Sequence, residues 1–161
     1  MDVVVTDHHR CDGRIPDCCA VVCHTREDDK YPNGDICGAG IAWKLAEGLI
    51  GREAAKRYLP QAGIATMADV VPLLGENRAL AALGLRAMRQ TARPGLRALM
   101  QTAGMQENAD IGGMQAAFLL APRINACGRM DTADIALNLL STGNAARAAA
   151  LAAEADALNT R

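Results

Sequence analysis

The stretch Asp2-Val-Val-Val-Thr-Asp-His-His9 decides the fold class, because an apolar, β-branched run leads directly into three polar residues. Such a run is typical of a buried strand in a parallel sheet, here predicted over residues 2–6. In open α/β sheets, ligands bind at the carboxyl ends of the strands, where Asp7, His8 and His9 stand. A second apolar run, Ala20-Val-Val-Cys23, predicts another strand.

Residues from Gly38 onward follow a helical pattern, beginning with an apolar stripe of Ile41, Leu45 and Leu49. Asn144 is the expected N-cap of the last helix, whose many alanines favour helix but bury little area. The predicted fold is therefore α/β, with about two parallel strands followed by a largely helical region. Breaks at proline and glycine separate helices expected over residues 38–50, 53–68, 77–91, 95–103, 113–120, 132–141 and 145–158.

Two short strands do not form a stable sheet alone, because strands buried on both faces need neighbours to satisfy their backbone groups. The strand 2–6 begins almost at the first residue, so its neighbours are expected upstream of Met1. The sequence thus predicts a chain truncated at its N-terminus.

Composition favours one compact cytoplasmic domain, since half of the 161 residues are hydrophobic and no apolar run approaches the roughly 20 residues that span a bilayer. The start of the chain lacks the basic segment of a secretory signal. We expect the six cysteines to be reduced, because two are adjacent and the chain is too large for a disulfide-stapled fold. Zinc is an alternative that lacks paired Cys-x-x-Cys spacing at Cys18, Cys19, Cys23 and His24.

The net charge of −1 argues against a protein that binds nucleic acid by bulk charge alone. Between Asn77 and Met105, however, there are five arginines and no acidic residue. Three of them, Arg86, Arg89 and Arg93, are spaced to share one helix face. That face could follow the phosphates of a nucleic acid, or it could be a solvated surface.

Asp7, His8 and His9 offer one carboxylate and two imidazoles, a donor set that suits Mn²⁺, Fe²⁺ or Zn²⁺. Alone, the tripeptide is a weak signal, and the alternative is a loop with a capping aspartate and exposed histidines. Asp69 is a single carboxylate in an apolar stretch, and a buried carboxylate is unfavourable unless it is paired or binds a metal. It is thus a candidate ligand, or a cap for the chain around Pro72.

A third polar group follows Pro122, which is expected to end a helix. Together with a tight turn at Gly128, this would bring Arg123, Asn125 and Arg129 together from an irregular loop. Arginine and asparagine side chains donate well to phosphate oxygens. The alternative is a surface loop whose arginines satisfy the carbonyls at a helix end.

In order and spacing, these motifs resemble the DHH family of phosphoesterases, and within it the RecJ exonucleases. The segment 3–9 resembles the DHH signature, and Ile36-Cys-Gly-Ala-Gly-Ile-Ala-Trp-Lys-Leu45 resembles the glycine-containing helix that follows it. Residues 65–78, 121–129 and 158–161 resemble later RecJ segments. The resemblance covers nearly the whole chain.

The resemblance implies a 5′-to-3′ exonuclease of DNA repair and recombination that acts on single-stranded DNA with two divalent ions, Mn²⁺ or Mg²⁺. Carried over by motif, His8, His9 and Asp69 would be metal ligands. Asp7 would orient the histidines.

The same resemblance implies that Arg123, Asn125 and Arg129 steer or stabilise the scissile phosphate. The candidate nucleic-acid contacts are Arg86, Arg89, Arg93, Arg123 and Arg129. A single-strand-binding protein or a helicase would be a partner.

In the family, the remaining carboxylates lie upstream of the DHH motif, so this chain is expected to hold part of the metal site and to show little activity alone. The expected organisation is residues 1–72 as the C-terminal part of a DHH domain, 73–143 as a helical region completing its core, and 144–161 as the start of a connector helix to a missing domain. The alternatives are a DHH enzyme acting on oligonucleotides, cyclic dinucleotides or polyphosphate, and a non-catalytic nucleic-acid-binding remnant.

Overall fold

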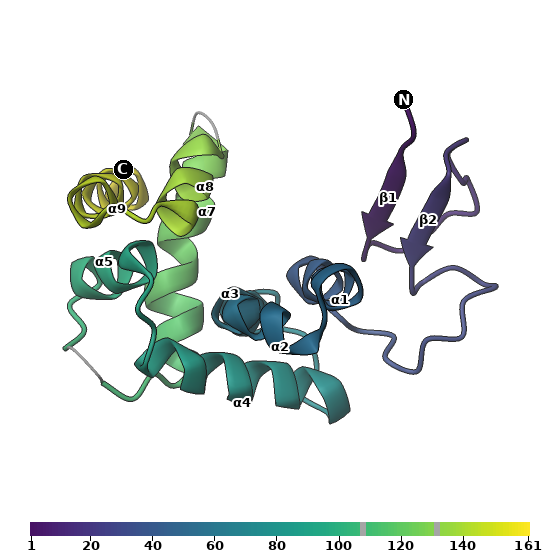
Figure 1. Cartoon of the computed structure of the whole chain (residues 1–161), viewed down its shortest axis with the longest axis horizontal. Helices are drawn as coiled ribbons and strands as arrows, with labels where there is room; N and C mark the ends of the chain where they lie inside the picture. Colours follow the sequence, from purple (N-terminus) through teal and green to yellow (C-terminus); the bar gives the residue numbers. More distant parts are fainter. Residues whose placement is uncertain (107–108, 131–132) are drawn as a thin grey trace.

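The computed structural model describes residues 1–106, 109–130 and 133–161 (Figure 1). Strand β1 spans Val4–Asp7 and strand β2 spans Ala20–Cys23. The two strands pair in parallel, with Val4 opposite Ala20 and Asp7 opposite Cys23. The predicted α/β class, with two parallel strands followed by helices, is confirmed. Figure 1 places this sheet at the end of the molecule opposite to the C-terminal helix.

The apolar side chains on one face of the sheet are exposed to solvent. Val4 is 55% exposed and Val22 is 47% exposed. Within the described part of the chain, the sheet consists of two strands, and helix α1, Gly38–Ile50, lies beside β1. The face that carries Val4 and Val22 is exposed, whereas the face that carries Val5 and Cys23 is half-buried to buried. The prediction of a strand buried on both faces is therefore wrong for this chain.

Beyond α1 the described chain is helical, and short turns separate its elements. They are α2 Arg52–Ala55, the 3₁₀ turn η1 Lys56–Tyr58, α3 Leu59–Ala68, α4 Gly75–Arg89, α5 Pro94–Thr102, α6 Gly113–Gln115, the π-helical turn η2 Ala116–Leu120, α7 Ala121–Met130, α8 Asp134–Ser141 and α9 Ala145–Thr160. Residue 132, where the helix that corresponds to α8 was predicted to begin, lies outside the described residues. Among the described residues, no helix is both long and apolar enough to cross a membrane.

Helix α7 occupies the region where the sequence predicted an irregular loop. Pro122 is its second residue and follows directly on the π-helical turn η2. Proline lacks an amide hydrogen, and its ring crowds the backbone carbonyl one turn earlier in a regular α-helix. A π-helical turn changes which backbone groups are hydrogen-bonded at that point. The helix therefore continues through Pro122, and the three polar residues predicted on a loop project from a helix instead.

Helices α3 and α4 cross where two glycines meet. A Cβ atom on Gly63 would lie 2.8 Å from the Cα atom of Gly84, and one on Gly84 would lie 2.5 Å from the carbonyl oxygen of Leu59. Real side chains do not fit at these distances. Glycine at both positions therefore permits the close crossing, and α3 carries several residues of the site described below.

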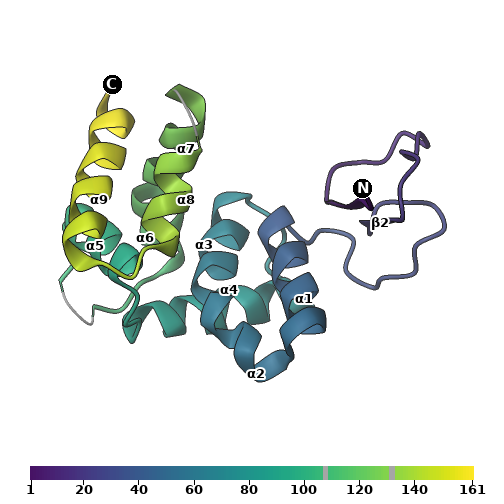
Figure 2. The ribbon, with the colours of Figure 1, turned by 45° about the horizontal axis from the view of Figure 1, so that its top comes forward.

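The main apolar core lies among the C-terminal helices, which run side by side in Figure 2. The Asn144 side chain accepts a hydrogen bond from the backbone N–H of Arg147 at 2.9 Å, which confirms the predicted N-cap of α9. Three alanines of α9 are fully buried, and their small side chains let α9 pack closely on α5, α7 and α8. These alanines are Ala148, Ala152 and Ala155.

Candidate metal centre

A cavity of about 390 Å³ opens between the end of β1 and helices α1, α3, α7 and α8. His8, Asp69 and Asn125 supply polar groups to it. Most of the remaining wall is apolar, and it consists of Cys37, Gly38, Ala39, Gln61, Ile64, Ala65, Ala68, Ala121, Ile124 and Leu140. The fold thus brings together one residue from each of the three motifs that the sequence singled out.

His8 and Asp69 form the polar pair of this cavity. The Nδ1 atom of His8 lies 3.7 Å from Oδ2 of Asp69, and the two side chains are 29% and 42% exposed. This separation is too long for a hydrogen bond. Two adjacent ligands of an octahedral ion with bonds of about 2.1 Å lie about 3 Å apart, so a small shift would let both side chains bind one cation.

The first residue of α1 supports the His8 ring. A Cβ atom on Gly38 would lie 3.0 Å from Cδ2 of His8 and 3.3 Å from its Nε2. Because Gly38 has no side chain, the imidazole rests against the helix backbone. The start of α1 therefore fixes how far His8 reaches into the cavity.

Asp69 ends helix α3, and its backbone N–H donates to the carbonyl of Ala65 at 2.9 Å. The next residue, Val70, has a φ of 55°. This left-handed conformation is unfavourable for a β-branched residue. The chain thus turns sharply just after Asp69.

Asp7 organises the histidine pair without lining the cavity. Its Oδ1 atom accepts hydrogen bonds from the backbone N–H of His8 at 2.7 Å and of His9 at 3.1 Å, and lies 2.7 Å from Nδ1 of His9. The bonds from the His9 backbone and ring, together with that from the His8 backbone, lower the pKa of Asp7 from 3.8 to about 2. Asp7 is therefore ionised and orients both residues.

His9 occupies a different place from His8. Its side chain is 77% exposed, and it lies in a second hollow with Asp7 instead of lining the cavity of Asp69. The ring centroids of the two histidines are 4.4 Å apart. The structure thus brings His8, and not His9, directly to Asp69, and a metal-binding role for His9 stays a prediction.

Thr25 holds the turn after the histidines, and sequence reasoning missed it. Its Oγ1 donates to the carbonyl of His9 at 2.7 Å and accepts from the backbone N–H of Cys11 at 3.1 Å. The Sγ atom of Cys23 lies 3.1 Å from the same hydroxyl. A hydroxyl residue just beyond the end of β2 was the available signal, because parallel strands bring their carboxyl ends to one edge.

The three predicted phosphate-binding residues of α7 lie in different surroundings. Asn125 lines the cavity, and Arg129 is exposed further along the helix. Arg123 is held in the protein, because its Nη2 lies 2.8 Å from Oδ1 of Asp156 in α9 and its Nη1 donates to the Leu119 carbonyl at 2.6 Å. Of the three predicted phosphate-binding residues, Asn125 is therefore the one at the cavity.

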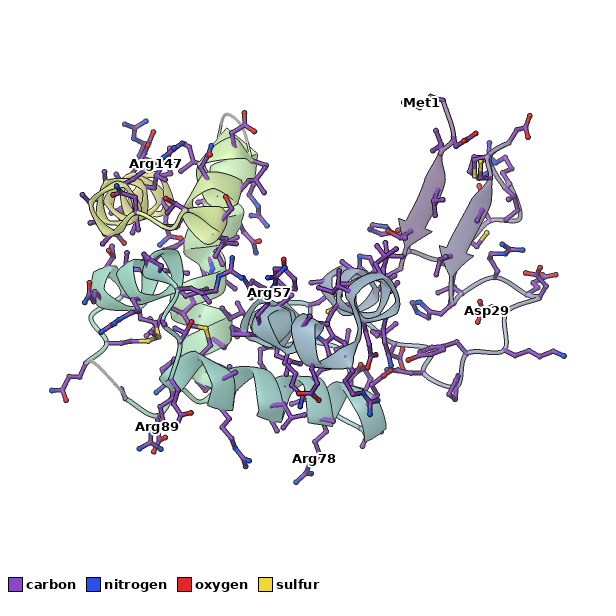
Figure 3. All side chains as sticks on the ribbon, viewed as in Figure 1. Met1, Asp29, Arg57, Arg78, Arg89 and Arg147 are labelled. Carbon is purple, nitrogen blue, oxygen red and sulfur yellow. The ribbon has the colours of Figure 1, made fainter. Side chains whose placement is uncertain are left out.

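The three arginines predicted to share a helix face do not do so. Arg86 and Arg89 belong to α4, whereas Arg93 is the N-cap of α5 and donates to a carbonyl of α8 at 2.8 Å. Pro94 forces the residue before it into an extended conformation, which separates Arg93 from α4. Arg89 lies 2.8 Å from the Asp110 carboxylate. Figure 3 shows Arg78 and Arg89 pointing outward from α4.

Within residues 1–106, 109–130 and 133–161, no group of three or more His, Cys, Asp or Glu side chains is placed to hold a metal ion. The alternative zinc cluster around Cys18 is therefore not formed, and none of the six cysteines is in a disulfide. His8 and Asp69 fit a divalent cation as two of its ligands.

No family model matches the chain. The chain is 43% identical over 162 residues to the single-stranded-DNA-specific exonuclease RecJ of Bacillus subtilis, a match that covers 99% of this chain and 20% of that relative. It is 39% identical over 163 residues to RecJ of Thermus thermophilus, which covers 100% of this chain and 24% of the relative. The chain thus spans about a quarter or less of the length of these two relatives.

Solved structures agree with the sequence matches. A crystal structure of RecJ from Thermus thermophilus in complex with Mn²⁺ superposes with a TM-score of 0.83 at 37% identity, over 99% of this chain and 24% of that one. A structure of exonuclease RecJ bound to manganese gives the same TM-score and identity, over 99% of this chain and 40% of that one. By sequence and by fold, the chain is similar to a fragment of RecJ exonucleases and matches part of their length.

Proposed function

We propose that this chain forms part of the active site of an exonuclease that hydrolyses single-stranded DNA in the 5′-to-3′ direction. The observation that carries the proposal is the meeting of His8 and Asp69, 3.7 Å apart, in a cavity that Asn125 also lines. A neutral imidazole and a carboxylate suit a divalent ion such as Mn²⁺. RecJ structures determined with Mn²⁺ and with Mg²⁺ support the same choice of ion.

His8 and Asp69 would hold the ion, which when bound activates water and stabilises charge on the reacting phosphate. Asp7 keeps the His8 backbone in place, and Gly38 limits the position of the ring. The amide of Asn125 is able to donate a hydrogen bond to a phosphate oxygen at the cavity.

We further propose that this chain alone hydrolyses DNA weakly or not at all. Two-metal hydrolysis needs about six coordination positions for each ion, partly filled by water. His8, His9 and Asp69 are too few for two ions, and the described residues contain no cluster of three such ligands. More ligands must join this cavity before two ions bind tightly.

The DNA strand would approach the cavity along α7, where Arg129 is exposed beyond Asn125. Arg86 offers another exposed cation on α4. Side chains of this kind contact phosphates without reading the base sequence. We place the protein in DNA repair and recombination, with a single-strand-binding protein or a helicase as partner, on the strength of its RecJ relatives.

Titration of the chain with Mn²⁺, measured by isothermal titration calorimetry, tests the proposed site. We expect one Mn²⁺ site that is weakened at least tenfold by His8→Ala or Asp69→Asn, consistent with the loss of one ligand. Asp12→Asn is the matched control, because Asp12 is exposed and pairs locally with Arg14. Equal Mn²⁺ binding by the wild type and both cavity variants would overturn the proposed site.

Incubation with 5′-phosphorylated single-stranded DNA tests the proposed reaction. The chain with Mn²⁺ is expected to bind this DNA and to release few nucleotides. Rapid Mn²⁺-dependent digestion that His8→Ala abolishes would contradict the proposed weak activity while supporting the site. Preferential cleavage of a cyclic dinucleotide or of polyphosphate would instead assign another DHH activity.

A further inference from the structure

Asn77, the third residue of α4, is a polar side chain that is only 2% exposed. Its Nδ2 donates to the carbonyl of Asp35 and to that of Pro72, each at 3.1 Å. Its Oδ1 accepts from Nδ2 of Asn33 at 2.8 Å. Both donors and the oxygen of this amide are therefore hydrogen-bonded, and they connect two separate loops.

The first of these loops leads to His8. Asp35 stands two residues before Cys37, and Cys37 and Gly38 both line the cavity. Gly38 in turn lies against the His8 ring. A bond to the Asp35 carbonyl thus fixes the chain that enters α1, and with it the backbone against which His8 rests.

The second loop leads back to Asp69. Pro72 follows Asp69 by three residues, and between them Val70 has a φ of 55° with its side chain 85% exposed. Such a conformation persists where the surrounding structure enforces it, and an exposed side chain provides little of that constraint. The bond from Asn77 to the Pro72 carbonyl holds the chain just beyond this turn.

Glu76, the neighbour of Asn77, adds a second connection between the same parts. Its carboxylate lies 2.6 Å from Nζ of Lys44 in α1 and accepts a hydrogen bond from the Tyr31 hydroxyl at 2.6 Å. Asn33 contacts both Glu76, at 3.3 Å, and Asn77. The start of α4 is therefore tied to α1 and to the loop before it.

We infer that Asn77 is a positioning residue that sets the distance between His8 and Asp69. It touches neither the cavity nor its polar pair. It fixes the two backbone segments from which that pair is held, one before α1 and one after α3. The inference rests on the proposed metal site for its functional meaning, and on the hydrogen bonds of Asn77 for its structure.

The test uses Asn77→Asp, which has nearly the same shape but lacks the two donated hydrogen bonds, and Asn77→Ala. Mn²⁺ affinity is measured by calorimetry well below the unfolding temperature of each variant. Both variants are expected to bind Mn²⁺ about tenfold more weakly than the wild type, the size seen when groups supporting metal ligands are removed. Leu96→Val is the control, because Leu96 is fully buried in α5 and belongs to the main apolar core. It should lower stability and leave Mn²⁺ affinity unchanged.

Amide hydrogen exchange gives a readout that does not depend on metal. Exchange is expected to rise in residues 33–38 and 69–74 of both Asn77 variants and to stay unchanged in α5 and α9. If both variants fail to fold, Asn33→Ala is used instead, because it removes the hydrogen bond that orients Asn77. Exchange should then rise in the same residues, but by a smaller amount.

These measurements distinguish failure of the proposed metal site from failure of the positioning role of Asn77. If the wild-type chain binds no Mn²⁺, the proposed metal site fails, and the exchange pattern alone decides whether Asn77 holds the two loops. If the wild type binds Mn²⁺ and the Asn77 variants bind it within twofold of the wild-type affinity, the positioning role is overturned. Uniform exchange changes across the whole chain would also overturn it, because they would show a general loss of stability.

Discussion

His8 and Asp69 meet with 3.7 Å between Nδ1 and Oδ2, although one follows a strand near the start of the chain and the other ends a helix far along it. Neither residue is held by the other, since this distance is too long for a hydrogen bond. Their approach depends on the backbone around them. Gly38 lies under His8, and the Val70 turn follows Asp69.

Gly38→Ala should weaken metal binding without unfolding the protein. The new Cβ atom would lie 3.0 Å from Cδ2 of His8, which is closer than ordinary contacts, so the ring must move. We expect Mn²⁺ affinity to fall about tenfold, as it does when the support of a metal ligand is disturbed. Calorimetry and the NMR shifts of the His8 ring measure this change.

Gly48→Ala in the same helix is the matched control. Nothing lies within 4 Å of a Cβ atom at Gly48, so alanine fits freely and should stabilise the helix by about 0.5–1 kcal/mol. Mn²⁺ affinity should not change. If the two substitutions lowered the affinity equally, the contact between Gly38 and His8 would not be the cause.

Val70→Gly should stabilise the protein. The left-handed conformation costs a valine about 1–2 kcal/mol, whereas glycine adopts it freely but loses about 0.5–1 kcal/mol of chain entropy on folding. Because the Val70 side chain is 85% exposed, little packing is lost. We expect a gain of up to about 1 kcal/mol, which raises Tm by about 2–4 °C in thermal unfolding. A lower Tm would show that the valine side chain contributes packing at this turn.

Local patterns in the sequence predicted much of this fold. The β-branched run 20–23 became β2, and Asn144 became the N-cap of α9, because strand preference and capping depend on near neighbours. The parallel pairing also followed from the pattern, since apolar strands without a tight hairpin turn favour parallel sheets. A shared site for the three motifs was implied by the family resemblance and not by any local pattern.

What the sequence could not predict depends on partners far along the chain. Asn77 hydrogen-bonds to residues 42 and 44 positions away, and no local spacing marks that network. Helix α7 continues through Pro122 because a π-helical turn precedes it, a feature without a sequence rule. Arg123 looked like a phosphate ligand, but its partner Asp156 comes from a helix packed alongside.

The stability of the chain should fall at low pH partly because of Glu76. Burial raises the pKa of this carboxyl, but the bonds from Lys44, Tyr31 and Asn33 outweigh it, so that the pKa lies below the usual 4.5. A depressed pKa stabilises the fold above 4.5, and this contribution is lost as the pH falls toward the folded-state value. Glu76→Gln should therefore flatten the dependence of unfolding free energy on pH below 4.5, as measured by urea unfolding.

Glu53→Gln is the control for this pH series, because Glu53 is 82% exposed and pairs with Lys56 at the surface. Surface pairs of this kind contribute little to stability. The curve of Glu53→Gln should follow that of the wild type. A wild-type curve that is already flat between pH 3 and 5 would refute the role of Glu76.

Arg123 and Asp156 should couple in stability, whereas Arg129 should act on DNA. The Arg123 and Asp156 side chains are 15% and 36% exposed and join α7 to α9, so a double-mutant cycle with alanine should give a coupling of about 0.5–3 kcal/mol.

Arg129 is exposed, so Arg129→Ala should change stability by less than about 0.5 kcal/mol. If Arg129 contacts a phosphate, its loss should reduce the salt dependence of single-stranded DNA binding by about 0.7 in the log–log slope. No coupling in the cycle, together with a reduced salt slope for Arg123→Ala, would return Arg123 to the phosphate-binding role that its motif implies.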